Sequence, residues 1–267
     1  MTGFSAEWLA LRETYDLSAR NPAVLAVLAA DMADRASIRV VDLACGTGAT
    51  MRAVASRLPL EQHWRLVDND EGLLARAAAF NARMQVDIQL NDISCDLEAA
   101  LAAPLDLVAT SALLDLVSDA WLQRFASKIA DRGLQVYAAL TYDGRISLDP
   151  AEAFDAEIVA AVNRHQRRDK GFGSALGPTA ASAAIARFEA LGYAVDSGKS
   201  DWRLGPDDRE IQRELVAGWA SAARETGALR AADIDAWVLR REEKITAGRS
   251  SISVGHVDFF GRPIKVR

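Results

Sequence analysis

Hydrophobic and polar positions follow two alternating patterns along the first half of the chain. Short and nearly continuous apolar runs, such as residues 38–44, are typical of strands that are buried on both faces of a parallel sheet. Between these runs, apolar residues recur every three or four positions, as in amphipathic helices. The expected strands are residues 38–44, 64–67, 86–90, 105–110 and 134–140, and the expected helices are residues 49–58, 73–81, 97–102 and 120–130. This order predicts βαβ units and a doubly wound α/β sheet with right-handed crossovers.

The segments outside this core have helical patterns. Aromatic and apolar residues between positions 4 and 15 have helical spacing, and Asn21 before Pro22 is a typical start of a second helix. After Thr141 the alternation ends, and Asp149 and Pro150 are expected to open a long helix. The later expected elements are a glycine-rich turn at 170–178, helices at 180–191, 206–224 and about 231–247, and a closing strand at 251–260.

The length of 267 residues fits one α/β domain with additions better than two separate domains. We therefore expect a single domain over 1–267. Its predicted parts are N-terminal helices (1–36), a ligand-binding core (37–142), two helical insertions on the substrate side (143–178 and 205–248) and the closing strand (249–267).

Composition narrows the classes of partner. The net charge of −6 argues against general affinity for nucleic acid or for anionic membranes. No apolar run is long enough for a membrane span, and the first ten residues lack a secretion signal, so a cytoplasmic location is expected. Cys45 and Cys95 form no C-x-x-C pair and the three histidines are far apart, so no metal site is expected. The oligomeric state stays open, because Trp202, Trp219 and Trp237 could serve a core or an interface.

A glycine loop follows the first expected strand directly. In the run Val40-Val41-Asp42-Leu43-Ala44-Cys45-Gly46-Thr47-Gly48, the two glycines let the backbone turn sharply and lie against a ligand without a β-carbon in the way. The free amides of the next helix suit an anionic or polar ligand group. Asp68 lies twenty residues after Gly48, at the end of the second strand, where a carboxylate can accept both ribose hydroxyls of a nucleoside cofactor.

These features alone also fit a nicotinamide-dependent enzyme. Met51, however, stands where a G-x-G-x-x-G fingerprint needs its third glycine, and the chain lacks a Tyr-x-x-x-Lys pair for proton transfer. Hydride transfer is therefore the weaker interpretation.

Residues 41–48 resemble motif I of class I S-adenosylmethionine-dependent methyltransferases, and residues 67–70 resemble the acidic motif after it. Residues 91–93 and 106–114 also resemble segments of that family, so the resemblance covers roughly 38–140 and the closing strand. It implies a seven-stranded Rossmann-like sheet whose last strand is antiparallel, with S-adenosylmethionine as cofactor. The cofactor-binding residues expected on this basis are Asp42, Ala44, Gly46, Thr47, Gly48, Asp68, Asn69 (beside adenine), Asp92 (on the adenine amino group), Ile93 (packed on the ring), Ser111, Leu113 and, from the N-terminal helix junction, Arg20.

For Asp42 and Asp92, a purely structural role is an alternative to cofactor binding. Asp42 can hold the cofactor's amino group through water, or it can satisfy loop amides at the strand end. Asp92 can meet the adenine, or it can act as a helix cap or turn residue before Ser94. The sequence leaves both alternatives open.

Methyl transfer from a sulfonium is an in-line displacement, and a general base is needed only if the acceptor must lose a proton. His165, Asp115 and Tyr142 are the candidates for the acceptor side. His165 is expected on the apolar face of the helix after Pro150, either as a satisfied core histidine or as a site residue. Asp115 and Tyr142-Asp143 follow the fourth and fifth strands, where they act on the acceptor or serve as a helix cap and a turn.

The basic segment from Arg164 to Lys170 also has two interpretations. Its charges complement the dipole of its own helix, whose first turns are acidic, or they bind an anionic substrate together with His165. We therefore predict methyl transfer from S-adenosylmethionine to a small-molecule acceptor, an anionic one under the second interpretation. The alternatives are another use of the same cofactor, an NAD(P)-dependent oxidoreductase, and a non-catalytic module that binds S-adenosylmethionine.

Overall fold

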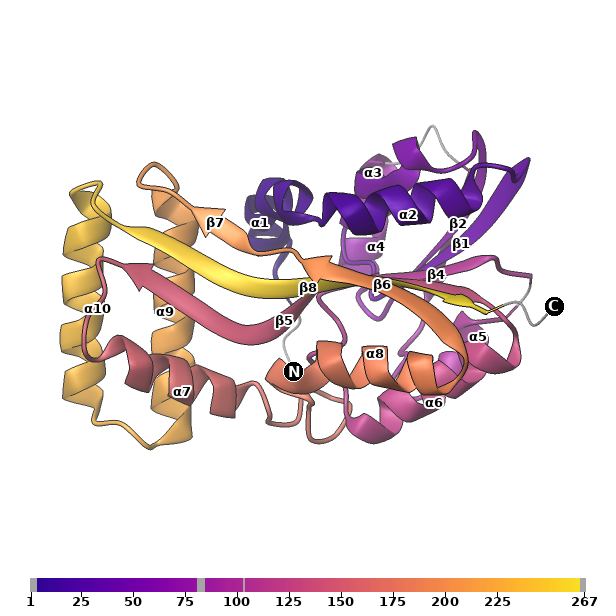
Figure 1. The fold of residues 1–267 in the computed structure, drawn as a ribbon. Helices are drawn as coiled ribbons and strands as arrows, with labels where there is room; N and C mark the ends of the chain where they lie inside the picture. The colour runs from indigo at the N-terminus through magenta and orange to yellow at the C-terminus, as the bar shows by residue number, and fades with distance from the viewer. Residues whose placement is uncertain (1–3, 81–84, 103, 265–267) are drawn as a thin grey trace.

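The computed structural model describes residues 4–80, 85–102 and 104–264. Within these residues, eight strands form one sheet in the order β3-β2-β1-β4-β5-β8-β6, and the short β7 pairs beside β8 (Figure 1). The first five strands are parallel, and β8 runs antiparallel to its neighbours β5, β6 and β7. The predicted doubly wound sheet with an antiparallel closing strand is confirmed, with β7 as a strand beyond the predicted seven. The strands are Ser37–Leu43 (β1), Glu61–Asp68 (β2), Gln85–Leu90 (β3), Leu107–Ser111 (β4), Gln135–Asp149 (β5), Tyr193–Lys199 (β6), Trp202–Leu204 (β7) and Ser251–Pro263 (β8).

Helices cover both faces of the sheet. In Figure 1, α2, α3 and α4 lie on one face, and α5, α6 and α8 lie on the other. Asn21 caps α2 as predicted, because its side chain accepts hydrogen bonds from the amides of Ala23 and Val24. The helix expected at 73–81 is observed up to Phe80, and Asn81 lies outside the described residues. The helices are Ala6–Ala19 (α1), Pro22–Met32 (α2), Ala49–Val54 (α3), Glu71–Phe80 (α4), Leu97–Ala100 (α5), Asp119–Asp131 (α6), Asp155–His165 (α7), Ala180–Ala190 (α8), Arg209–Thr226 (α9) and Ala231–Thr246 (α10), with short 3₁₀ turns at Ala55–Arg57 and Gly177–Thr179.

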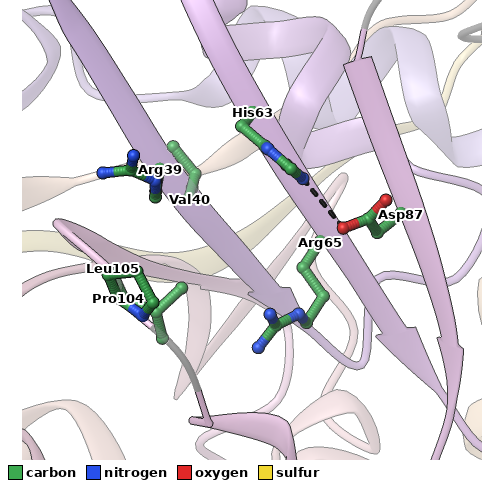
Figure 2. A pocket seen from close by; sticks show the side chains of 7 residues that line it. All are labelled: Arg39, Val40, His63, Arg65, Asp87, Pro104 and Leu105. Carbon is green, nitrogen blue, oxygen red and sulfur yellow. Dashed lines mark hydrogen bonds and ion pairs between the residues drawn. The ribbon is translucent and has the colours of Figure 1, made fainter.

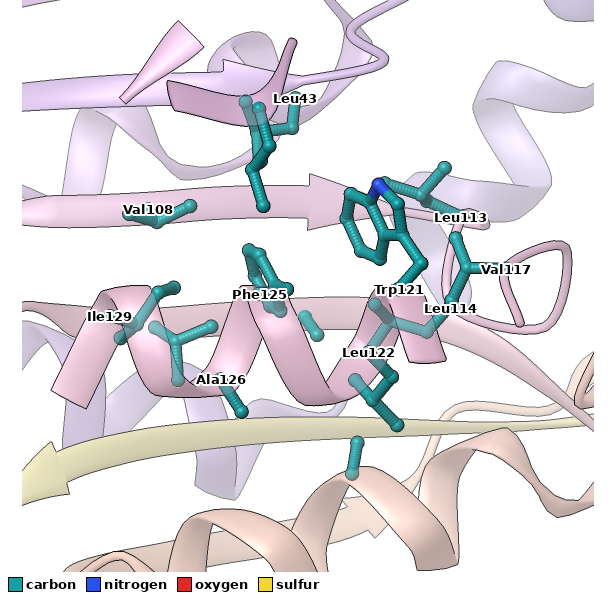
Figure 3. Close-up of a cluster of buried hydrophobic side chains, with 14 of the residues drawn as sticks. Leu43, Val108, Leu113, Leu114, Val117, Trp121, Leu122, Phe125, Ala126 and Ile129 are labelled. Carbon is teal, nitrogen blue, oxygen red and sulfur yellow. The ribbon is translucent and has the colours of Figure 1, made fainter. Parts of the chain in front are cut away.

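The apolar runs of the strands supply the core on both faces. Along β1, Val41 and Leu43 pack toward α6, whereas Val40 packs toward α2. On the α6 side, Trp121 stacks on Phe125 with ring centroids 5.1 Å apart (Figure 3). This alternation of side chains across a doubly covered strand explains why the run reads as continuously hydrophobic.

The largest departure from the prediction is the length of β5. It was expected to end at residue 140, with a helix from Pro150, but it continues to Asp149, and α7 begins only at Asp155. Two register shifts in its pairing with β8 let the strand bend and continue. Tyr142 and Asp143 therefore lie within a strand at a bulge, where the Asp143 carboxylate accepts the Arg145 amide over 3.1 Å in a local turn. Gly144 relieves the crowding at this bulge, because a β-carbon would approach Pro178 Cβ to 2.8 Å.

The far halves of β5 and β8 leave the main sheet as an antiparallel ribbon, which β7 widens and α7, α9 and α10 cover (Figure 1). We call this unit the extension. Its core includes Trp202, Trp219 and Trp237, so these tryptophans serve the interior of the chain. Arg241 of α10 is fully buried, donates to the carbonyl of Pro150 and pairs with Asp155, which ties α10 to the start of α7.

A hollow of about 130 Å³ lies over the amino-terminal halves of β1, β2 and β3. Figure 2 shows Arg39, His63 and Arg65 on the bare sheet there, with His63 paired to Asp87. Because α5 has only four residues, it leaves this part of the face uncovered, which explains the charged side chains. The hollow is at the end of the strands opposite the glycine loop. No helix in the described part of the chain is long and apolar enough to cross a membrane.

Candidate active site

The glycine loop at the carboxyl end of β1 has the strained backbone that its sequence predicts. Ala44, Gly46 and Gly48 have φ values of 53°, 53° and 81°. The Gly48 amide donates to the carbonyl of Cys45 over 2.8 Å, which closes the turn before α3. Ala112, directly after β4, also has a positive φ of 51°. Strained backbone at two adjacent strand ends marks this edge of the sheet as a site for a ligand.

Asp68 at the end of β2 holds this loop from the side. One carboxylate oxygen accepts the Gly46 amide over 2.8 Å and the other accepts the Asp70 amide over 3.0 Å. Burial raises the pKa of Asp68, and the amides of Gly46, Asp70 and Asn69 oppose that shift. Asn69 is exposed beside it. Asp68 therefore shapes the loop, and the binding of ribose hydroxyls remains its predicted second role.

Asp42 and Arg20 lie close enough for the charge of Arg20 to act on the Asp42 carboxyl. Asp42 is fully buried, and neither of its oxygens has a hydrogen-bond partner among the described residues. Burial raises its pKa to about 8, and the nearby Arg20 opposes that shift. Arg20 donates to the Tyr137 hydroxyl over 3.1 Å and to Ser111 Oγ over 3.5 Å, while its Nε has no partner in the described part of the chain. Asp42 thus does not serve loop amides.

The residues after β3 and β4 form the next part of this edge. Asp92 accepts the Ser94 amide over 2.9 Å, so the structure shows the turn that the sequence left as one alternative. Ile93 is buried, and its carbonyl accepts the Trp121 indole N–H over 2.8 Å, which fixes the loop against α6. Leu113 is buried after β4. Binding of adenine by Asp92 and Ile93 stays a prediction.

Helix α1 lies over the glycine loop. Leu9 Cδ1 lies 3.1 Å from where a β-carbon on Gly46 would stand. Glu13 pairs with both ends of the Arg52 guanidinium, and Arg52 also donates to the Thr47 carbonyl over 2.6 Å. This arrangement joins α1, the loop and α3.

The inward face of α1 is charged. Its buried residues are Arg12 and Asp16, which form a bidentate pair with distances of 2.9 and 3.1 Å. Asp16 also accepts the Trp202 indole N–H over 3.0 Å, and the Arg12 guanidinium lies 4.9 Å from a Trp202 ring centre. Trp8, Leu11 and Tyr15 of α1 pack against the core of the extension, and the buried ion pair lies beside them with Trp202 as a further hydrogen-bond partner.

Asp115 lies beyond β4 on the extension side of α1. It is 6% exposed, and its Oδ1 has no hydrogen-bond partner within the described residues. Burial raises its pKa to about 6, although its own amide, Arg12, the Tyr142 amide and Lys170 all oppose the shift. A buried carboxyl with a free oxygen and a pKa near 6 can accept a proton at neutral pH.

The other two acceptor-side candidates have hydrogen-bond partners elsewhere. The Tyr142 hydroxyl donates to Asn163 over 2.7 Å, and burial raises its pKa. His165 is partly exposed rather than facing an apolar side, and its Nε2 lies 2.9 Å from Glu225 of α9. A direct role of either residue on the acceptor stays a prediction.

Two residues of the basic segment Arg164 to Lys170 contact different parts of the protein. Arg168 donates to the Glu225 carbonyl over 2.7 Å, so it caps the end of α9 rather than its own helix. Lys170 lies 3.4 Å from His165 Nδ1, and its charge acts on Asp115.

His256, which the sequence did not single out, is a buried polar residue of β8 beside Trp202 and Tyr142. It is 6% exposed, its Nδ1 has no partner in the described chain, and its ring centre lies 5.2 Å from Trp202 and 6.3 Å from Tyr142. Burial and the charge of Arg12 lower its pKa to about 3, so it is neutral at physiological pH. The sequence signal for His256 was its place between apolar residues of the closing strand.

Comparison with known proteins agrees with this geometry. The family model described as a methyltransferase domain matches residues 40–132. Among solved structures, YcgJ from Bacillus subtilis is 16% identical with a TM-score of 0.51, covering 92% of this chain and 100% of that one. A putative methyltransferase from Bacillus halodurans C-125 is 17% identical with a TM-score of 0.51, covering 91% and 100%. No curated protein matches the sequence.

Residues 40–132 thus match a methyltransferase domain, and this match supports a class I S-adenosylmethionine-dependent methyltransferase. The matched residues run from β1 to the end of α6 and contain the glycine loop, Asp68 and Asp92. The two solved structures support the fold over nearly the whole chain.

The residues of this methyltransferase fit its cofactor, S-adenosylmethionine. The fully buried carboxyl of Asp42 and the Nε of Arg20 are an acidic and a basic group without complete partners among the described residues. They match the ammonium and the carboxylate of a methionine moiety, and an unpaired buried charge is costly unless a ligand meets it. Gly46 leaves the space under Leu9 of α1 free of a β-carbon.

Cofactor binding at pH 7 is expected to release about one proton. Asp42, with a pKa of about 8, is mostly protonated in the free protein, and a bound ammonium group favours its ionised form. Calorimetric titration with S-adenosylhomocysteine in two buffers of different ionisation enthalpy measures this release. Asp42→Asn should remove it, whereas equal heats in both buffers for the wild-type protein would contradict the assignment.

Proposed function

We propose that this methyltransferase transfers the methyl group of S-adenosylmethionine to a small-molecule acceptor bound beside Asp115, and that Asp115 accepts the acceptor's proton. The observation that carries this proposal is the buried carboxyl of Asp115, which has an unpartnered oxygen at the carboxyl end of the central strand β4. In open α/β sheets, ligands bind at this edge. An acceptor that must lose a proton, such as a hydroxyl or a protonated amine, needs such a base.

Two cations favour an acceptor with an anionic group. Arg12 from α1 and Lys170 from the loop after α7 are both close enough to lower the pKa of Asp115. They approach it from different elements, so an anionic group between them would be held from both sides. Burial lowers the pKa of Lys170, and this loss of hydration favours an anion as its partner.

The chain's own contribution is alignment and exclusion of water. S-adenosylmethionine supplies a methyl group on a positively charged sulfur. Arg20 and Asp42 hold its methionine end, and α1, pinned by the Glu13 and Arg52 pair, covers the loop. Holding the methyl donor in place and excluding water from the acceptor site account for much of the rate enhancement in such a displacement.

A nucleic acid or a membrane lipid is a poor acceptor for this protein. The net charge of −6 disfavours a polyanion, and the cations near Asp115 are two buried or partly buried side chains rather than a basic groove. We therefore place the acceptor among free metabolites, in keeping with the cytoplasmic location predicted from the sequence.

The test is to incubate the protein with methyl-labelled S-adenosylmethionine and a cell extract that still contains its macromolecules. We expect the label in the low-mass fraction, in a product that an anion exchanger retains at neutral pH. Label in protein or nucleic acid would overturn the proposed acceptor class. No transfer from extracts of several growth conditions would favour a module that only binds the cofactor. A cationic or neutral low-mass product would overturn the anionic assignment alone.

A further inference from the structure

A carboxylate in the closing strand is buried next to the cofactor end of the sheet. Asp258 of β8 is fully buried, and it accepts the Leu140 amide over 2.8 Å and the Asn21 amide over 2.9 Å. Leu140 has a φ of 53° at the first bulge of β5, where the ladder to β8 is interrupted. Asn21 is the junction between α1 and α2. Asp258 thus joins the bulge and the helix junction.

Tyr137 extends this connection toward the site. Its hydroxyl lies 3.5 Å from Asp258 Oδ2, to which it donates, and it accepts from Arg20 Nη1 over 3.1 Å. Tyr137 is fully buried, and burial raises the pKa of its hydroxyl, as does Asp258, so it keeps the proton that this donation needs. The chain of contacts therefore runs from Asp258 through Tyr137 to Arg20.

Arg20 is the end of this chain and the only member with a free donor. Its guanidinium is held by Tyr137 and Ser111, its charge acts on Asp42, and its Nε has no partner among the described residues. Burial alone would lower the pKa of Arg20, but Tyr137, Asp258 and Asp16 raise it. Two nitrogens are thus fixed by the protein while the third is left for a ligand.

We propose that Asp258 and Tyr137 are positioning residues that aim the Arg20 guanidinium at the carboxylate of the cofactor's methionine moiety. This inference rests on the proposed cofactor role of Arg20. Neither Asp258 nor Tyr137 touches the cofactor. They fix a side chain that would otherwise have many rotamers, and this preorganisation strengthens the charge-assisted hydrogen bond to the carboxylate.

We call the chain of contacts from Asp258 through Tyr137 to Arg20 the relay. It predicts different effects of one substitution on two ligands, one with and one without the amino-acid carboxylate. S-adenosylhomocysteine has the amino-acid carboxylate, whereas 5′-methylthioadenosine has the same nucleoside and sulfur without it. We expect Tyr137→Phe to weaken binding of S-adenosylhomocysteine about three- to tenfold, the usual size of one hydrogen-bond contribution. Binding of 5′-methylthioadenosine should change less than twofold.

Tyr193→Phe is the matched control. Tyr193 is also a buried tyrosine of the sheet, and its hydroxyl donates to the backbone carbonyls of Ile129 and Leu134, at the connection between α6 and β5. It loses a buried hydrogen bond in the same way, but we expect it to leave the affinity for both ligands unchanged. Asp258→Asn is a second test. It removes the negative charge, and its amide N–H cannot accept the hydrogen bond that the Asn21 or Leu140 amide donates to the carboxylate.

The outcomes separate the relay from the cofactor assignment. If Tyr137→Phe weakens both ligands equally, or neither, the relay is wrong although the cofactor site stands. If the wild-type protein binds 5′-methylthioadenosine and S-adenosylhomocysteine equally well, Arg20 does not hold the carboxylate and the basis of the relay fails. If the wild-type protein binds neither ligand, the cofactor assignment itself fails. A folded Asp258→Asn variant should show the same selective loss as Tyr137→Phe.

Discussion

Gly46→Val is expected to lower the affinity for S-adenosylhomocysteine by about 100-fold or more. Gly46 has a φ of 53°, which a β-branched residue rarely adopts, and a β-carbon there would stand 3.1 Å from Leu9 Cδ1. We expect the added side chain to crowd the methionine end of the cofactor, which the glycine loop is predicted to contact. Loss of two charge-assisted hydrogen bonds, each contributing about 1.5–3 kcal/mol, gives an effect of that size. Calorimetric titration measures it.

Gly133→Val is the control that separates the effect of backbone strain from the effect of a side chain in the glycine loop. Gly133 has a φ of 59° in the turn between α6 and β5, and a β-carbon there would meet no atom within 4 Å. Both variants should therefore lose roughly 1–2 kcal/mol of unfolding free energy in a denaturant titration. Only Gly46→Val should lose the cofactor. Equal affinities in the two variants would show that the glycine loop does not contact the ligand.

Asp115→Asn is expected to reduce kcat about 100- to 10,000-fold, the usual contribution of a general base, with little change in cofactor affinity. The amide has nearly the shape of the carboxyl but cannot take the proton. The pKa of Asp115 is raised to about 6, so the acid form prevails below that pH and the active base form above it. The wild-type kcat/KM should therefore rise with pH through about 6, and the variant should lose this dependence.

Asp119→Asn serves as the comparison for this substitution. Asp119 is an exposed acid in the first turn of α6 that pairs with Arg187, so its loss should leave kcat within about twofold. His165→Ala is expected to cost less than Asp115→Asn, because His165 pairs with Glu225. If Asp115→Asn retains full turnover and the same pH profile, the acceptor does not lose its proton to Asp115.

The strand, glycine loop and helix that carry the predicted cofactor site could be predicted from the sequence because their signals are local. A buried strand, a glycine loop and a helix follow one another from 38 to 54, and Asp68 ends the next strand. Such units depend on near neighbours in the chain, so hydrophobic period and turn residues identify them. The same reasoning placed Asn21 correctly as the cap of α2.

The extension was harder to predict, since β5 passes through residues that usually end a strand. Asp143 and Gly144 are typical of a turn, yet here they belong to a bulge, and only pairing with β8 over residues 251–263 shows that the strand continues. His165 illustrates the same limit. The helical period placed it on an apolar face, but Glu225, sixty positions away on α9, determines its environment.

Long-range polar contacts were the part with no local signal. Arg12 and Asp16 look like an exposed helical pair, and Asp258 is a single acid in an apolar strand. Each is buried only because α1 folds over the sheet and β8 returns beside β5. Buried charges of this kind acquire their meaning from tertiary structure, since their partners lie on other elements.

Direct titration with S-adenosylhomocysteine, compared with NAD and NADP, tests the central claim that the glycine loop, Asp42, Asp68 and Arg20 hold an adenosyl amino acid. We predict saturable binding of S-adenosylhomocysteine with one ligand per chain, and no heat from either dinucleotide. Binding of a dinucleotide in place of S-adenosylhomocysteine, or no binding of any of the three, would contradict the account.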